Sequence, residues 1–346
     1  MSREKRTEGF RLWEYLLFTI ITVFVMLLCV CVGSVNLPLR ETAGVLWRAL
    51  CGAPQESGTA GSIILPVRLP RVLCVAFVGA SLSVGGAAMQ GLLKNPLADG
   101  STLGVSSGAS LGAILAIAFG VTIPGVPFAG TMVMAVLFAF LSLLLILSLA
   151  YRLDSSLSTN TIILIGVIFS MFVSSLSNLV ITFAGEKVKT ITFWTMGSLQ
   201  GSSYGNAALV GVTLAICGLI LLGCATELNA FAVGEDNART IGVNVRRMKL
   251  TVLICVSILI GVSVSIGGSI AFVGLVTPHM VRRIAGPNHR RLLPASAYGG
   301  AVFLLLSDLT ARTILRPREL PLGVVTSLIG AVVFVVIFFR MRKGSQ

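Results

Sequence analysis

Long apolar runs alternate with short polar breaks along almost the whole chain of 346 residues. A helix that crosses a bilayer needs about 20 predominantly apolar residues, and the runs reach or approach that length. We therefore expect an all-α polytopic membrane protein that forms one transmembrane domain over residues 1–346. The pattern predicts about ten spanning helices, at residues 12–32, 71–93, 103–119, 128–151, 161–183, 207–225, 250–266, 269–284, 293–311 and 322–339.

Glycine is frequent in the second and third predicted helices and in the polar break between them. Within a soluble helix each glycine costs about 1 kcal/mol relative to alanine, so its presence needs a reason. In a bilayer, small residues let neighbouring backbones approach closely. Gly104, Gly108 and Gly112 fall four apart, on one helix face. Their spacing predicts close packing against another helix.

The composition agrees with a membrane protein, since 55% of residues are hydrophobic and only 11% are charged. The net charge of +13 would suggest a nucleic-acid partner in a soluble chain. Here Lys and Arg lie mainly in the polar breaks, as the positive-inside rule describes, so no nucleic acid is expected. Both termini are predicted to be cytoplasmic, because basic residues lie near each of them: Arg3, Lys5, Arg6, Arg340, Arg342 and Lys343.

The seven cysteines lie mostly inside apolar runs and show no CxxC spacing. They are expected to be small core residues and neither metal ligands nor disulfide partners.

Three polar breaks are long enough to carry a function. Residues 33–66 and 184–206 are predicted to be external loops. Residues 226–249 form the longest internal loop, in which charges alternate with an apolar set that predicts one or two short amphipathic helices. A solvated loop that only sets orientation would need no apolar face, so a protein-docking surface is favoured. The apolar set is Phe231, Val233, Ala238, Ile241 and Val243.

Several arginines fall at the predicted external face, against the inside bias of basic residues. Short external loops tolerate a few such charges, which is the plain interpretation. The alternative is a cationic platform, because clustered charge orients and accelerates the docking of an acidic partner. These residues are Arg68, Arg71, Arg312, Arg316 and Arg318.

Catalytic signals are weak. The chain contains no GxxxxGK[ST] sequence, so it is not expected to bind ATP through a P-loop. Residues 104–108 match the GxSxG of serine hydrolases, with Ser106 as the nucleophile. That motif requires a strand–turn–helix context and a histidine base, and His279 and His289 are the only histidines.

Few polar side chains interrupt the predicted spans. His279 follows Pro278 and is expected to make a local hydrogen bond or cap. Asp308 lies four residues before Arg312, which predicts an intrahelical ion pair. A stand-alone secondary transporter or channel is an alternative class, although a proton relay would need a carboxylate nearer the membrane centre. One face of helix 161–183 is expected to meet protein or water, because it carries Ser170, Ser174, Ser177 and Asn178.

Several motifs, in this order, resemble the iron-siderophore, haem and vitamin B12 permease family of bacterial ABC importers. The resemblance covers residues 68–334 and departs from the usual family prolines at Gly100 and Val332. The motifs are RLPR at 68–71, MQGLLKNPLADGSTLGVSSGASLGA at 89–113, FWTMGSL at 193–199, GEDNARTIGV at 234–243, GSIAFVGLVTPHMVRRIAGPNHRRLLP at 268–294, SDLTAR at 307–312 and ELPLGVVTSLIG at 319–330.

This resemblance implies a type II ABC importer permease of about ten helices in the bacterial cytoplasmic (inner) membrane. It implies a homodimer, two ATPase subunits on the cytoplasmic side and an external solute-binding protein. The implied cargo is an iron chelate, a ferric siderophore or haem, with cobalamin as the alternative. The chain itself would be a transport subunit and not an enzyme, and it would bind no cofactor. The partner ATPase would use ATP and Mg²⁺.

The resemblance also implies roles for individual residues. The external binding protein would dock on Arg68, Arg71 and Arg312. Within the coupling loop 226–249, the ATPase would contact Gly234, Glu235, Ala238, Arg239, Ile241 and Gly242. The path would be lined largely by helix 161–183 of each copy, including Ser174 and Asn178. Its internal gate would lie near Asn95, Leu97, Thr159 and Asn160.

Overall fold

The computed structural model describes residues 9–35, 37–53, 58–124, 129–154 and 158–343, and its regular structure there is helical. Each of the ten predicted spans corresponds to a helix in this part of the chain. Seven of these helices are long and apolar enough to cross a membrane, while α5, α13 and α15 have shorter apolar stretches. The ten are α1 (Leu12–Cys31), α4 (Leu69–Leu93), α5 (Val105–Ala118), α6 (Ala129–Leu153), α7 (Thr159–Phe183), α9 (Tyr204–Gly223), α12 (Val245–Gly267), α13 (Val273–Ala285), α14 (His289–Thr313) and α15 (Leu322–Lys343).

Short helices occupy segments that were predicted to be loops, and this is a correction. Residues 33–66 contain α2 (Leu39–Leu50), α3 (Thr59–Ile63) and the start of a π-helical turn (Ile64–Arg68). Residues 184–206 contain a 3₁₀ turn (Gly185–Lys187) and α8 (Val188–Thr195). Glycine interrupts both segments and proline interrupts the first, but each segment still holds stretches long enough for short amphipathic helices.

The helix predicted at 269–284 begins later than expected, at Val273. Gly268 and Phe272 both have positive φ, at 67° and 68°, so the backbone between them is not helical. The basic residues Arg3, Lys5 and Arg6 lie outside the described residues.

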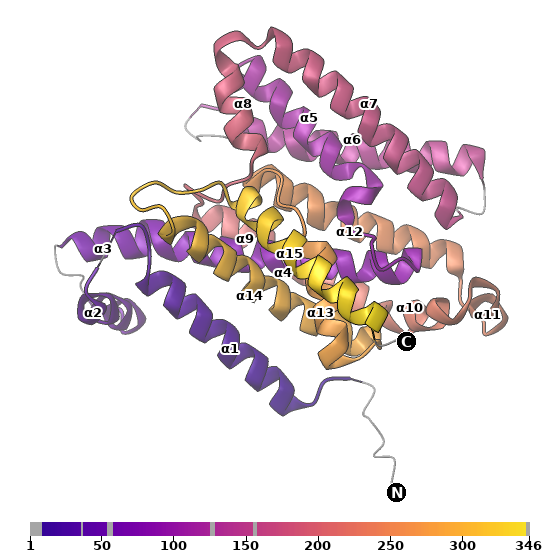
Figure 1. Cartoon of the computed structure of the whole chain (residues 1–346), viewed down its shortest axis with the longest axis horizontal. Coiled ribbons are helices and arrows are strands. Elements are labelled where there is room, and N and C mark those ends of the chain that lie inside the picture. Colours follow the sequence, from indigo (N-terminus) through magenta and orange to yellow (C-terminus); the bar gives the residue numbers. More distant parts are fainter. Residues whose placement is uncertain (1–8, 36, 54–57, 125–128, 155–157, 344–346) are drawn as a thin grey trace, which may run out of the picture.

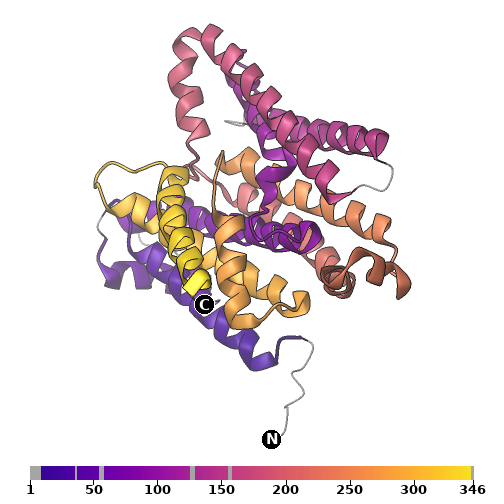
Figure 2. The ribbon, with the colours of Figure 1, turned by 45° about the vertical axis from the view of Figure 1, so that its right-hand side comes forward.

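Helix α4 is the centre of the molecule. It packs against α14, α12, α9 and α13, and 83% of the most apolar window in the helical stretch Thr59–Leu93 is buried. Figures 1 and 2 show α5, α6, α7 and α8 as a group on one side of α12, with α1 on the opposite side of the molecule. At one end of the bundle lie α2 and α3, and at the other lie α10 (Ala225–Val233) and α11 (Glu235–Thr240) (Figure 1). We call these the α2–α3 end and the α10–α11 end.

Glycine allows the closest helix contacts. A Cβ atom at Gly86 would lie 1.9 Å from the carbonyl oxygen of Gly274 on α13. On α5, a Cβ at Gly108 would lie 1.8 Å from Ser142 Oγ, and one at Gly112 would lie 2.3 Å from the Met134 carbonyl oxygen, both on α6. The predicted close packing of this face is therefore confirmed at Gly108 and Gly112. Gly104 is the N-cap of α5 with φ 75°, and a Cβ there would lie 3.1 Å from the Gly166 carbonyl oxygen on α7, so it also packs closely, against a different helix.

Replacing Gly86 with alanine is expected to destabilise the protein by about 1–3 kcal/mol, because overpacking forces the backbones of α4 and α13 apart. The neighbouring Gly85 provides a matched control, since a Cβ there would lie 3.5 Å from Val256 Cγ1, an ordinary contact. Thermal unfolding of the two purified variants in detergent measures the difference. Equal melting temperatures for Gly86→Ala and Gly85→Ala would contradict the assigned contact.

Candidate docking, coupling and translocation sites

A buried cluster of charges joins α4 to α14 near the α2–α3 end. Arg71 contacts Asp308 and Glu319, in each case with a nitrogen–oxygen distance of 2.8 Å. Asp308 also contacts Arg312 at 2.8 Å, one helical turn away, which confirms the predicted intrahelical ion pair. Arg71, Asp308 and Arg312 are buried. With Glu319 the cluster holds two positive and two negative side chains, so its formal charge is balanced.

Arg68 and Arg312 also hold the end of α1. The Arg68 guanidinium donates to the carbonyl oxygens of Val30 at 2.9 Å and Cys31 at 3.1 Å. Arg312 donates to the Cys29 carbonyl at 3.2 Å. The last carbonyls of a helix have no partner within the helix, so these arginines satisfy groups that would otherwise be unpaired.

The predicted cationic platform therefore needs correction. Arg68, Arg71 and Arg312 are only 5%, 7% and 2% exposed, and their guanidinium groups bond within the chain. Arg316 and Arg318, in the turn after α14, have exposed side chains. Docking by Arg68, Arg71 and Arg312 stays a prediction, but the positive charge that a partner could reach at this end lies on other side chains.

The segment predicted to couple to a partner protein forms two short helices, α10 and α11, as expected. The apolar set does not share one face, however. Phe231 and Ala238 are buried, whereas Val233 and Ile241 are 77% and 72% exposed. We call α10 and α11 together the α10–α11 module. Its buried apolar residues attach it to the bundle, and its exposed apolar residues form an uncovered outer side.

Phe231 attaches this module to two spanning helices. The Lys94 ammonium lies 4.6 Å from the centre of the Phe231 ring, and the Lys249 ammonium lies 5.6 Å from it. Lys94 ends α4 in a left-handed conformation and directly precedes Asn95. A movement of α10 can therefore displace the start of the α4–α5 connection through the contact between Phe231 and Lys94.

Glu235 provides a second attachment. Its carboxylate accepts hydrogen bonds from Lys249 at 3.0 and 3.1 Å and from Arg239 at 2.8 Å. Burial alone would raise the pKa of Glu235, but the bonds and charges of Lys249 and Arg239 outweigh it and lower the pKa below its usual value. The carboxylate therefore stays ionised at neutral pH and binds α11 to α12.

His289 and Asn229 form a third link, which the sequence did not indicate. Asn229 on α10 accepts a hydrogen bond from the His289 backbone N–H at 2.8 Å, and its Oδ1 also lies 2.8 Å from the ring Nδ1. A Cβ at Gly91 on α4 would lie 2.3 Å from the same ring. His289 therefore packs where α4, α10 and α14 meet and does not belong to a solvated loop.

The residues predicted for ATPase coupling divide into two groups. Arg239, Ile241 and Gly242 are exposed, while Ala238 is fully buried and Glu235 is committed to Lys249. Gly234 connects α10 to α11. Their coupling role stays a prediction, and the exposed group is the part that a partner can contact.

The predicted gate residues lie at two separate places at the α10–α11 end, the α4–α5 connection and the start of α7. Asn95 accepts a hydrogen bond from the Leu97 backbone N–H at 2.9 Å, and Leu97 is 53% exposed. Thr159 and Asn160 lie in the first turn of α7, which Ser158 caps. The 3₁₀ turn Gly100–Leu103 contacts α7, and no hydrogen bond joins the two pairs within the described residues.

The predicted polar face of α7 is exposed in part. Ser174 and Asn178 are exposed, among large apolar side chains such as Met171 and Phe172 that are 67% and 64% exposed. Ser170 and Ser177 instead donate to backbone carbonyls one turn earlier in α7. The face at Ser174 and Asn178 is therefore mainly apolar, with a few polar groups.

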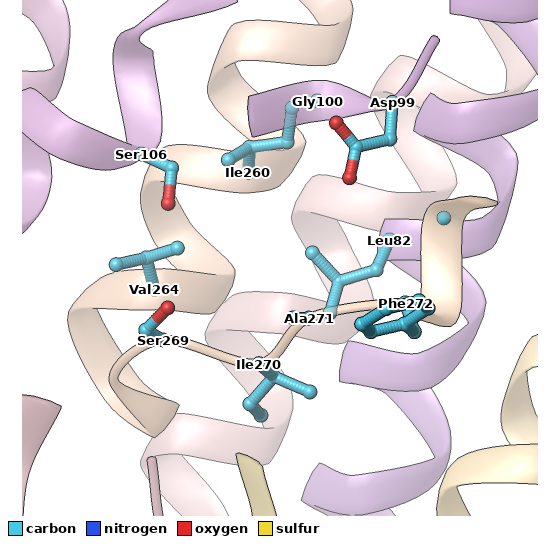
Figure 3. A pocket seen from close by; sticks show the side chains of 11 residues that line it. Leu82, Asp99, Gly100, Ser106, Ile260, Val264, Ser269, Ile270, Ala271 and Phe272 are labelled. Carbon is cyan, nitrogen blue, oxygen red and sulfur yellow. The ribbon is translucent and has the colours of Figure 1, made fainter. Parts of the chain in front are cut away.

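A small cavity of about 70 Å³ lies between the α4–α5 connection, α12 and the non-helical segment 268–272. Figure 3 shows Asp99, Ser106 and Ser269 around it, together with Ile260 and Phe272. A Cβ at Gly100 would lie 1.9 Å from Ile260 Cδ1, so α12 closely approaches this connection. Neither histidine lines the cavity, so Ser106 there has no imidazole base and the hydrolase motif lacks its required geometry.

His279 does not behave as predicted. Both of its ring nitrogens are buried and without a hydrogen-bond partner among the described residues, so the expected local hydrogen bond or cap is wrong. Pro278 lies inside α13 and is itself buried.

Comparison with known proteins identifies the chain. The FecCD transport family matches residues 21–340. The chain belongs to this family. It is therefore a multi-pass membrane protein and the permease subunit of an ABC importer, not an enzyme.

Relatives and a solved structure agree with this assignment. The chain is 41% identical to the ABC transporter permease protein YvrB of Bacillus subtilis, over 95% of this chain and 94% of that one. It is 36% identical to the cobalamin import system permease protein BtuC of Halobacterium salinarum, over 85% of this chain and 79% of that one. A structure described as an inward-facing metal-chelate type ABC transporter superposes with a TM-score of 0.82 at 32% identity, covering 94% of this chain and 98% of the other. The fold is that of an ABC importer permease.

Proposed function

We propose that this permease imports an iron chelate, a ferric siderophore or haem, across the bacterial cytoplasmic (inner) membrane. Names among its relatives support this cargo, including the hemin permease HmuU of Yersinia pestis and the Fe(3+) dicitrate permease FecD of Escherichia coli. Cobalamin is the second candidate, because BtuC of Halobacterium salinarum is also a relative. Molybdate is a further alternative, on the ground of MolB of Haemophilus influenzae.

In this proposal the α10–α11 end faces the cytoplasm, as do both termini. Two copies of the chain pair around a central path, and two ATPase subunits bind at that end and use ATP and Mg²⁺. The observation that supports the coupling most directly is the uncovered apolar side of the α10–α11 module. Exposed apolar residues surrounded by polar ones are typical of a protein–protein contact. Val233, Ile241 and the exposed Arg239 would form that contact.

The internal bonds of the module suggest how ATPase closure reaches the gate. Phe231 joins α10 to Lys94, which directly precedes Asn95 in the chain. Glu235 joins α11 to Lys249 on α12, and α12 approaches Gly100 through Ile260. A shift of the module would therefore move the segment Asn95–Leu97 relative to α7, where Thr159 and Asn160 form the other side of the gate.

The path itself would run along the exposed α7 faces of two paired copies, past Ser174 and Asn178. A weakly polar, mainly apolar wall suits a large chelate, because strong polar contacts would hold the cargo and slow its release. Selectivity would then rest largely with the external binding protein.

That binding protein would dock at the α2–α3 end. We propose that Arg68, Arg71 and Arg312 hold the shape of this surface, because they fix the end of α1 to α4 and α14. The exposed Arg316 and Arg318 would supply the reachable positive charge.

Uptake of labelled substrates tests the proposal. Cells that lack this permease should recover uptake of one ferric siderophore or haem when the gene is restored, and the recovery should require the partner ATPase. Rescue of cobalamin or molybdate alone would change the cargo and keep the mechanism. Uptake by the purified chain without any ATPase, driven by an ion gradient, would instead establish a stand-alone secondary transporter.

A further inference from the structure

An apolar groove of about 300 Å³ lies on the outside of the bundle between α1, α13 and α14. Helix α14 packs against both of the others and forms the floor of the groove, and α1 runs alongside it (Figure 1). Nearly all of the lining is apolar, and it includes Phe18, Ile21, Met280, Ile284, Val302 and Leu306. Because these helices belong to a membrane protein, the groove opens toward lipid and not toward water.

An exposed arginine, Arg283, lies near one end of this groove. On α13, Met280 and Ile284 line the groove, and Arg283, which does not itself line it, lies one turn after Met280 at the edge of that face. Arg283 is exposed and makes no hydrogen bond or ion pair with any described residue. It is near the C-terminus of α13, which places it at the α10–α11 end of the groove, where headgroups meet the helix ends.

Three other arginines around this end are already engaged. Arg291 on α14 pairs with Glu14 on α1, and both are largely buried. Arg282 donates to Gln90 at 3.1 Å, and Arg290 donates to Thr226 at 3.0 Å. Arg283, by contrast, has no hydrogen-bond or ion-pair partner among the described residues, and it lies near a surface that fits a hydrocarbon chain.

We propose that this groove binds one anionic phospholipid, with an acyl chain along α14 and the headgroup phosphate on Arg283. Basic residues at the membrane face between spanning helices favour anionic headgroups in general. Helix α13 lies along the groove, and its C-terminal end leads into α14 at His289, which contacts Asn229 on α10. A bound lipid would thus brace α13 and α14 beside the coupling module.

Native mass spectrometry of the purified, detergent-solubilised permease tests the proposal with phosphatidylglycerol and with phosphatidylcholine of the same acyl chains. The wild type is expected to retain phosphatidylglycerol preferentially. Arg283→Gln should weaken that binding about fivefold, because one cation near the headgroup contributes about that factor. Arg247→Gln is the matched control, since Arg247 is also exposed at the α10–α11 end but lies on α12, away from the groove.

A second pair of variants tests the groove itself. Met280→Trp fills it and should reduce the retention of both lipids, whereas Leu145→Trp, at a similarly exposed position on α6, should not. Melting temperatures without added lipid establish that all four variants fold. Equal retention of the two lipids by the wild type, or equal effects within either pair of variants, would overturn the proposal. A bound protein in place of lipid, seen as added mass in the same spectra, would also overturn the proposal.

Discussion

Replacing Ile241 with aspartate is expected to abolish ATP-driven uptake while the permease still folds. Ile241, directly after α11, is 72% exposed, and Val233, at the end of α10, is 77% exposed. A central apolar contact of a protein interface contributes about 2 kcal/mol or more, so losing it should weaken ATPase association at least about 30-fold. A buried, unpaired carboxylate would weaken it further. Co-purification with the ATPase and uptake by reconstituted vesicles measure the two effects.

The substitution must be made at an exposed residue, so that it changes the interface and not the fold of α11. Ala238 was also predicted to contact the ATPase, but it is fully buried, so a bulky charged residue there would disrupt α11 itself. Ile123→Asp is the control, because Ile123 is an exposed apolar residue in the connection between α5 and α6, at the other end of the bundle. If Ile241→Asp keeps full co-purification and uptake, the outer side of α11 is not the ATPase contact.

Replacing Arg71 with glutamine is expected to destabilise the protein by about 3–5 kcal/mol, which is typical when one partner of a buried ion pair is removed. The loss leaves Asp308 and Glu319 with one arginine between them, in a cluster where Asp308 is fully buried. The melting temperature in detergent measures this effect, and binding-protein affinity should be measured only on the folded fraction.

Arg318→Gln is the matched control for this second prediction. Its side chain is exposed in the turn after α14, so its effect on stability should stay within about 0.5 kcal/mol. It should instead weaken the docking of an acidic binding protein, with a dependence on salt concentration. A stable Arg71→Gln variant that has lost only docking would show that Arg71 acts directly on the partner.

The two histidines illustrate how far residue patterns reach. The sequence places His279 near the end of the predicted helix 269–284 and His289 in the basic break that follows it, and it predicts a hydrogen bond or cap for His279 alone. In the structure His289 bonds to Asn229, 60 positions earlier in the chain, while both His279 ring nitrogens have no hydrogen-bond partner among the described residues. Contacts between helices that are distant in sequence decide this difference, and periodicity within one helix carries no information about them.

The same limit explains the arginines. A count of basic residues on each side of the membrane identified Arg68, Arg71 and Arg312 as unusual. Their burial depends on Glu319 and on the carbonyls that end α1, which reach them only when α1, α4 and α14 pack together. The coupling loop was more predictable, because an amphipathic pattern is a local property that specifies short helices directly.

The sequence by itself determined the class of protein, the spanning helices to within a few residues and the family. These follow from local features: an apolar run long enough for a bilayer must become a helix, because its backbone groups find no water there. Only the tertiary structure decided which side of each helix is buried, which arginines a partner can reach and which surfaces stay uncovered. Those outcomes depend on which helices lie side by side, and glycine contacts such as that of Gly86 with Gly274 set that arrangement through shape complementarity between distant segments.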